Sequence, residues 1–192
     1  RRDQKEMVVE MIKRSPMQIL IEEHGHIRSM LSCFRVQIDR FERAEDPDYE
    51  ILGGSIAYCN DYLDRWHHPH EDALLHLLQR RAPSEASACA ELEDQHAGLA
   101  RTTRALVKIF EAVQRDAPFV RGDLVEQGRT LLHDYDQHLD WEETHFFPVV
   151  TEKLRPEDWR EIAPRFADAV DPLAASPIDD RYQALFTAIG GG

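Results

Sequence analysis

The chain has 192 residues, of which 42% are hydrophobic and 31% charged, and its formal net charge is −13 at pH 7. This size and composition suit one domain of an ordinary soluble protein, with room for an appended terminal segment. The acidic balance disfavours nucleic acid and anionic membrane surfaces as partners, because both attract a basic face.

The sequence also bears on the cellular compartment. No stretch approaches the roughly 18 consecutive apolar residues that a membrane span needs. No signal-peptide pattern opens the chain. The three cysteines, Cys33, Cys59 and Cys89, are scattered and odd in number, which is typical of reduced thiols. We therefore expect a cytoplasmic protein, or one from which a leader has been removed.

Long amphipathic runs separated by proline-containing breaks fill most of the chain. A short amphipathic piece at 4–14 precedes Ser15-Pro16, which is a helix-entry signal. The first long run, 17–44, has apolar residues at alternating steps of four and three, as in a helix packed in a bundle. One member of this seam is a histidine. The seam consists of Leu20, His24, Ile27, Leu31, Phe34, Ile38 and Phe41.

The third run, 85–115, repeats the first, because each seam position falls 72 residues after its counterpart and His96 takes the place of His24. The second and fourth runs, 49–81 and 121–150, each carry a His-x-x-x-Glu pair. A two-helix unit used twice predicts an all-α fold: an up-down-up-down antiparallel four-helix bundle with short loops.

We expect this bundle to span 16–150. Residues 1–15 would form an N-terminal extension. Residues 151–192 would form a C-terminal helical tail, with short helices near 156–169 and 179–189, that packs on the bundle or on a partner.

The two His-x-x-x-Glu pairs are His67 with Glu71 and His138 with Glu142. In a helix this spacing places both side chains on one face, one turn apart. An imidazole beside a carboxylate is a donor set that iron, manganese or zinc accepts. Either pair alone is more typical of a solvated helix face. Their recurrence in matching register, each followed by an acidic residue, favours metal binding.

His24 and His96 add a single histidine to each of the other two seams. Burying an unpaired imidazole or carboxylate costs several kcal/mol unless it finds a partner. In antiparallel helices of equal length, all six residues can share one level of the bundle, where a pair of metal ions would satisfy them. The predicted metal ligands are His24, His67, Glu71, His96, His138 and Glu142.

These residues belong to longer motifs: Ile21-Glu22-Glu23-His24, His67-His68-Pro69-His70-Glu71-Asp72, Asp94-Gln95-His96 and His138-x-x-x-Glu142-Glu143-x-x-Phe146-Phe147-Pro148. Over about 17–150 the chain resembles the hemerythrin-like family of His-His-Glu cation-binding domains. The resemblance implies a non-haem di-iron centre, oxo- or hydroxo-bridged, in an up-down four-helix bundle. It also implies that Glu71 and Glu142 bridge the two irons and that the four histidines cap them.

The chain departs from the oxygen-carrying hemerythrins, which have five histidine ligands, two of them one turn apart on the third helix. Here the residues one turn from His96 are Leu92 and Ala100, and neither can bind a metal. A water, a substrate or another side chain must fill that place. The candidate side chains are His68, His70, Asp72 and Glu143.

A vacant position favours a centre open to a small oxidant, namely O2, peroxide or NO. The corresponding roles are binding, sensing or reducing such a molecule, or iron homeostasis. By the resemblance we expect iron, although the ligands also allow manganese or zinc. The long helices and the extra C-terminal segment favour a homodimer.

Two alternatives remain open. A ferritin-like carboxylate di-iron oxidase needs Glu-x-x-His motifs on alternate helices, whereas Glu93-x-x-His96 and Glu142-x-x-His145 lie on the third and fourth. A metal-free helical adaptor would work through its acidic surface, and replacing His67 and Glu71 would then leave its partner binding intact.

Overall fold

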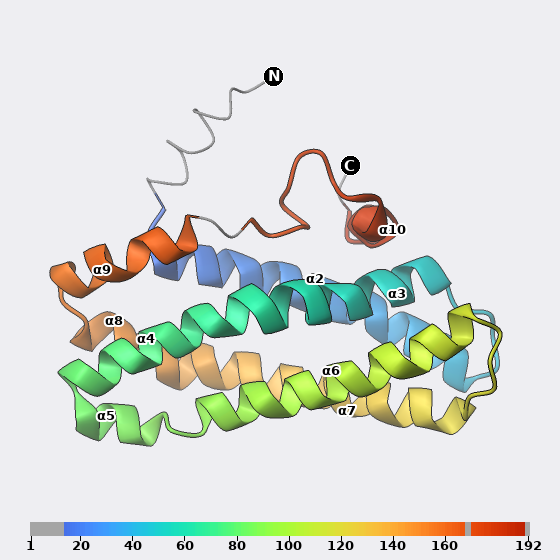
Figure 1. The fold of residues 1–192 in the computed structure, drawn as a ribbon, viewed down its shortest axis with the longest axis horizontal. Coiled ribbons are helices and arrows are strands. Elements are labelled where there is room, and N and C mark those ends of the chain that lie inside the picture. The colour runs from blue at the N-terminus through green and yellow to red at the C-terminus, as the bar shows by residue number, and fades with distance from the viewer. Residues whose placement is uncertain (1–13, 168–169, 191–192) are drawn as a thin grey trace.

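The computed structural model describes residues 14–167 and 170–190, and in these ranges all regular structure is helical. Long helical runs pack lengthwise against one another (Figure 1). Most of the predicted N-terminal piece, 4–14, lies outside the described residues. The elements are α2 (Pro16–Glu42), α3 (Tyr49–Tyr58), the π-helical segment η1 (Cys59–His67), α4 (His68–Arg81), α5 (Pro83–Ala88), α6 (Leu92–Gln114), α7 (Arg121–Trp141), the π-helical segment η2 (Glu142–Phe146), α8 (Phe147–Lys153), α9 (Pro156–Phe166) and α10 (Asp180–Ala188).

The first two long runs begin at side chains that cap their N-termini. The Ser15 hydroxyl accepts a hydrogen bond from the backbone N–H of Gln18, and the Gln18 side chain accepts one from the backbone N–H of Ser15. Both otherwise unpaired donors are thereby satisfied. Asp48 caps α3 in a similar way, accepting from the N–H groups of Glu50 and Ile51.

The third run differs from the prediction. A continuous helix from residue 85 was expected, but α5 ends at Ala88 and α6 begins only at Leu92. Between them the backbone hydrogen bonds span three residues, from Cys89 N–H to the Ala86 carbonyl and from Leu92 N–H to the Cys89 carbonyl. This tighter turn lets α5 fold back on α4, so that Ala86 and Cys89 are buried. The gain from burying them outweighs the helical periodicity of the sequence.

The second and fourth runs each contain a π-helical segment that ends two residues before a proline, Pro69 and Pro148 respectively. A proline within a helix lacks an N–H, and its ring clashes with the carbonyl four residues earlier. In the widened segments the preceding N–H groups reach back five residues, from His68 to the Leu63 carbonyl and from Phe147 to the Glu142 carbonyl. The predicted interruption at Pro69 is therefore a local widening, and α4 continues the run.

The core consists of two apolar clusters with buried polar side chains between them. Along α2 the chain passes from Leu20 in one cluster, through His24, to Ile27 in the other. The second run passes them in the opposite order, because Leu63 belongs with Ile27 and Leu74 with Leu20. The third and fourth runs repeat these two orders. The polar residues thus lie at one level, sealed on both sides by apolar packing.

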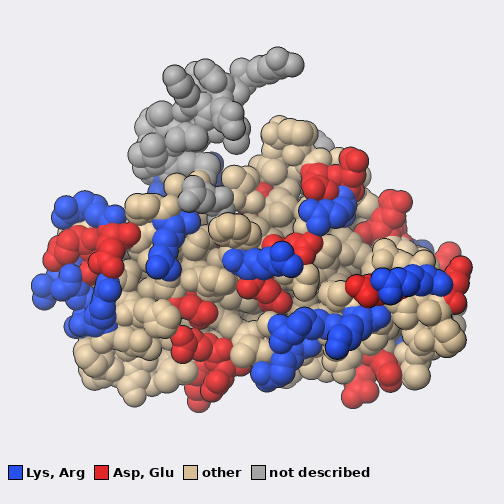
Figure 2. Space-filling model, in the orientation of Figure 1, with Lys and Arg blue, Asp and Glu red and all other residues tan. Residues whose placement is uncertain are grey.

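The C-terminal helices pack on the outside of the long runs. Helix α9 contacts α2 and α4, and the Arg81 guanidinium donates to both carboxylate oxygens of Asp158. Helix α10 lies against α3 (Figure 1). On the face shown in Figure 2, basic and acidic side chains are interleaved. In the described ranges, no helix combines the length and apolarity needed to cross a membrane.

Candidate metal centre

The six predicted ligands meet in one buried group, which we call the polar layer. They come from all four long runs, so only the folded chain brings them together. Every one of them is buried. The polar layer consists of His24 on α2, His67 at the end of η1, Glu71 on α4, His96 on α6, His138 on α7 and Glu142 at the start of η2.

Glu71 lies between the two halves of the repeat. Its Oε1 is 3.4 Å from Nε2 of His24 and 3.4 Å from Nε2 of His67, whereas its Oε2 is 3.4 Å from Nε2 of His96. These separations are long for hydrogen bonds. They are close to the spacing of about 3.0 to 3.4 Å between neighbouring ligand atoms that each lie about 2.1 Å from one ion.

Glu142 occupies the corresponding place on the fourth run. Its Oε2 is 3.4 Å from Nε2 of His24 and 3.3 Å from Nε2 of His138, and its Oε1 is 3.6 Å from Nε2 of His96. Each carboxylate therefore reaches imidazoles of both halves. Two of the groups of ligand atoms that are close enough to hold an ion include these glutamates: His24, His67 and Glu71 form one, and Glu71, His96, His138 and Glu142 form the other.

The outward nitrogen, Nδ1, of each of these histidines faces a hydrogen-bond acceptor. Because a carboxylate or amide oxygen accepts, Nδ1 carries the proton and the lone pair of Nε2 points into the layer. The four pairs are His24 with Glu143 at 2.9 Å, His67 with Glu23 at 2.7 Å, His96 with Asp72 at 2.7 Å and His138 with Gln95 at 3.0 Å.

Two of these acceptors, Asp72 and Glu143, were candidate ligands, and they directly follow Glu71 and Glu142 in the sequence. The structure places both on Nδ1 atoms of the opposite half of the repeat. The roles of Glu23 and Gln95 were not predicted. The sequence does hold a pattern that could have indicated these roles: Glu23 directly precedes His24, and Gln95 directly precedes His96 at the same step of the repeat.

Several atoms that face the layer have no hydrogen-bond partner in the described part of the chain. They include Nε2 of His67, His96 and His138. The glutamate oxygens among them are Oε2 of Glu71 and both Oε atoms of Glu142. Leaving buried polar atoms unpaired costs free energy that a bound cation would recover. The donor set therefore fits a metal ion.

The local electrostatics agree with this fit. Burial raises the pKa of Glu71 well above its ordinary value, and the nearby Glu142 raises it further. Burial likewise raises the pKa of Glu142. Burial lowers the pKa of His96 and of His138 well below the ordinary value. Without a cation the layer thus favours protonated carboxyls and neutral imidazoles, and a cation would favour the carboxylates.

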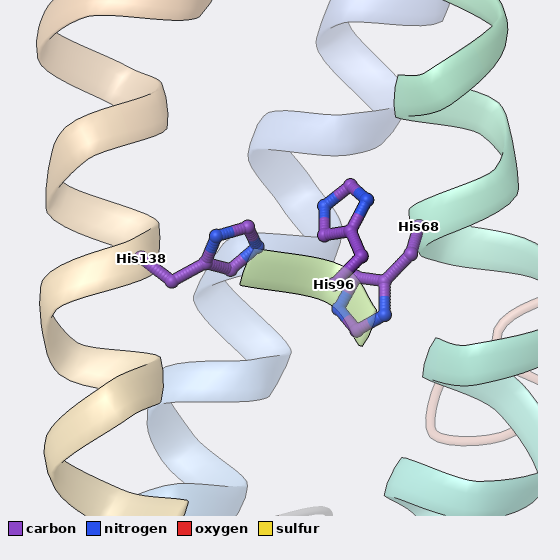
Figure 3. A group of neighbouring side chains, drawn as sticks. All are labelled: His68, His96 and His138. Carbon is purple, nitrogen blue, oxygen red and sulfur yellow. The ribbon is translucent and has the colours of Figure 1, made fainter. Parts of the chain in front are cut away.

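Of the remaining candidate ligands, His70 points away from the polar layer and His68 points into it. His70 turns outward: its Nε2 lies 3.0 Å from the carbonyl oxygen of Arg165, and its ring stacks on Phe166. His68 turns inward and stacks on His96, and both project with His138 from three helices toward a common space (Figure 3).

The Glu-x-x-His motifs of the ferritin-like alternative do not assemble. Glu93 pairs with His76 at the surface, with 3.0 Å between the Glu93 Oε1 and His76 Nε2. His145 is exposed and stacks on Trp141. Only Glu142 and His96 of these two motifs reach the polar layer, so the structure does not support the carboxylate-rich site.

The helical fold and the buried histidine–glutamate layer define a helical metal-binding protein. Residues 15–150 match the family model of the hemerythrin HHE cation binding domain, and the chain belongs to that family. Uncharacterised proteins of Mycobacterium bovis and of two strains of Mycobacterium tuberculosis are each 23% identical to it over 150 residues. The alignments cover 78% of this chain and 58% of those proteins, so this chain spans less than two thirds of their length. No solved structure matches the chain.

Proposed function

We propose that the chain is a non-haem di-iron protein of hemerythrin type that binds, senses or reduces O2, peroxide or NO, or serves iron homeostasis. The observation that carries the proposal is the convergence of unpaired Nε2 and carboxylate oxygen atoms in a layer sealed by two apolar clusters. The family supports a cation, and its di-iron members favour iron over manganese or zinc.

The proposal includes the up-down-up-down antiparallel order of the four long runs. The alternating order in which successive runs pass the two apolar clusters supports it. We also propose that the centre holds two ions, one beside His24 and His67 and one beside His96 and His138. Each of the bridging residues, Glu71 and Glu142, lies within 3.6 Å of imidazoles from both halves.

Bound iron would supply a ferrous–ferric redox couple and a coordination position for a small oxidant. The protein's own residues orient and insulate the site. Glu23 holds the His67 ring through Nδ1 and in turn accepts a hydrogen bond from the Tyr62 hydroxyl at 2.5 Å. The flanking clusters keep bulk water away, which strengthens the electrostatic contacts of the layer. A cytoplasmic location and a homodimer stay predictions.

The test is metal content and visible absorption measured on one sample. Protein loaded with Fe²⁺ without oxygen, desalted and then exposed to air or peroxide should hold about two irons per chain and develop a new absorption band. A lasting, reversible adduct with O2 would indicate binding or sensing. Rapid conversion to the ferric form would indicate reduction of O2 or peroxide.

A double variant controls for adventitious iron. Glu71→Ala with Glu142→Ala should abolish iron binding while circular dichroism shows that the helices survive. The matched control, Glu93→Ala with Glu152→Ala, removes two exposed glutamates and should retain both irons. Normal iron content in the Glu71/Glu142 variant, or no iron in preloaded wild-type protein, would overturn the proposal and favour the metal-free adaptor.

A further inference from the structure

His68 breaks the internal repeat. The repeat aligns His67 with His138 and Glu71 with Glu142, which aligns His68 with Leu139. Both positions are buried, with 3% of His68 and 1% of Leu139 exposed. One half of the molecule therefore buries an imidazole where the other half buries an apolar side chain. Burying an imidazole costs free energy unless its nitrogens bind a hydrogen-bond partner or a metal ion. The nitrogens of His68 therefore need such a partner or ion.

The neighbours of His68 are histidines of the polar layer. Its ring stacks on that of His96, with centroids 4.3 Å apart and planes 15° from parallel. Its ring lies nearly perpendicular to that of His138, at 85°, with centroids 5.6 Å apart. One ligand atom from each of the three imidazoles lies within 4.8 Å of the other two. Figure 3 shows these three side chains converging from separate helices. The nitrogens of the three imidazoles are thus close enough together to share an ion.

The surroundings of the two nitrogens of His68 resemble those of His67, His96 and His138. Nδ1 lies near a carboxylate, 3.5 Å from Oδ1 of Asp64, which is longer than the hydrogen-bonded Nδ1 contacts of those three histidines. Nε2 is buried and has no hydrogen-bond partner among the residues that the structure describes. Packing alone does not explain this arrangement, because leucine fills the corresponding place in the other half.

We propose that His68 is a further protein ligand of the metal ion beside His96 and His138. This inference rests on the proposed metal centre and adds a residue to it. The ion at His96 and His138 would then be held by three imidazoles, and the ion at His24 and His67 by two.

The first test compares the iron content of His68→Leu with that of wild-type protein and of His70→Leu. The His70→Leu control removes the outward-facing histidine of the same turn. Titration with Fe²⁺ without oxygen should give two ions per chain for wild type and His70→Leu. His68→Leu should bind one ion normally and the other at least about 100-fold more weakly, the upper end of the loss seen when only an outer-shell partner is removed. In His68→Gly, added imidazole should restore the second ion.

Each outcome separates this inference from the proposed function. If His68→Leu binds two ions as tightly as wild type, while the Glu71/Glu142 double variant binds none, His68 is not a ligand but the metal centre stands. If wild-type protein binds no ion, the metal centre fails and the inference fails with it.

A second measurement needs no variant, so it decides the question even if His68→Leu does not fold. Wild-type protein loaded with Co²⁺ should show a hyperfine-shifted, exchangeable proton resonance for each ligating imidazole, from the N–H at Nδ1. Five such resonances would support His68 as a ligand, together with His24, His67, His96 and His138. Four would overturn it.

Discussion

The Oε2 atom of Glu23 lies 2.7 Å from Nδ1 of His67, deep between α2 and η1. The corresponding contact in the other half joins the Oε1 of Gln95 to Nδ1 of His138 at 3.0 Å. The two contacts thus have the same geometry, but the acceptor is a carboxyl group in one half of the repeat and a neutral amide in the other. Although burial opposes ionisation, the hydrogen bond from His67 lowers the pKa of Glu23, so this residue is a carboxylate. A carboxylate makes the imidazole a stronger donor to a metal than an amide does.

Exchanging these two acceptors should redistribute metal affinity. We expect Glu23→Gln to weaken the binding of one of the two ions by about 10- to 100-fold. This is the usual effect of removing a carboxylate that hydrogen-bonds to a ligating histidine. Gln95→Glu should strengthen binding of the other ion. Competition with a chromophoric chelator would measure both constants. Equal losses at both ions, or no loss in Glu23→Gln, would contradict the assignment of Glu23 to His67 alone.

Glu71 and Glu142 should make the stability of the metal-free protein depend on pH. The pKa of each is raised in the folded state from an ordinary value of 4.5. Above pH 4.5 the folded state therefore holds more protons than the unfolded state, and the contribution of these groups to stability falls as pH rises through the folded pKa values. Compared with Glu71→Gln/Glu142→Gln, wild-type protein stripped of metal should lose stability progressively over that range.

Urea denaturation at several pH values would measure this difference. Histidines with lowered pKa values act in the opposite direction, but both proteins contain them, so they largely cancel in the comparison. Saturating metal should reverse the trend, because binding releases the protons of the carboxyls and tightens as pH rises. A constant difference between the two metal-free proteins across the pH range would contradict the raised pKa values.

Docking of the C-terminal segment should weaken at high pH. Asp171 accepts from the Tyr58 hydroxyl at 3.1 Å and lies 2.6 Å from Nδ1 of His26. The hydrogen bond to Asp171 raises the pKa of His26 from 6.5, against the opposing effect of burial. The stabilisation is therefore complete below pH 6.5 and is lost as pH rises through the raised value.

Hydrogen exchange of the backbone amides at 170–190 would follow this loss. After correction for the intrinsic pH dependence of amide exchange, the exchange rate should increase with pH in wild-type protein. In His26→Gln the corrected rate should stay constant. His76→Gln, which removes an exposed histidine paired with Glu93, should behave like wild type. The same pH dependence in His26→Gln and wild type would exclude His26 as its source.

Helices α2 and α7 approach closely at Gly128. A β-carbon built there would lie 2.5 Å from Cδ1 and 2.9 Å from Cγ1 of Ile38. Gly128→Ala should therefore destabilise the protein by about 1–3 kcal/mol, the usual cost of overpacking a core. In an Ile38→Ala background, which removes both atoms, the same change should cost much less.

A double-mutant cycle in urea would measure this coupling. Gly128 is ten residues from His138, about 15 Å along the helix, so iron content should stay at the wild-type value in folded Gly128→Ala. If the losses in the free energy of unfolding from Gly128→Ala and Ile38→Ala simply add in the double variant, the contact between the two positions does not limit stability.

Much of the architecture could be read from the repeat. Its seams predicted helical runs whose bounds agree with α2, with Tyr49–Arg81 and with Arg121–Lys153 to within a few residues. The same spacing predicted that His24, His67, Glu71, His96, His138 and Glu142 would share one level, where they all lie buried. The break before α6 was missed, because packing of Ala86 and Cys89 against α4 outweighs local helical preference.

The sequence by itself determined the type and level of the candidate metal-binding side chains, because helical periodicity decides which residues share a face and the repeat decides which faces correspond. Only the tertiary structure decided that His68 turns inward and His70 outward, and that Asp72 and Glu143 hold histidines of the opposite half. The widened turn of η1 rotates the residues after it away from the regular helical period. The pairs across the two halves depend on how neighbouring helices are packed, and no local pattern in the sequence encodes that arrangement.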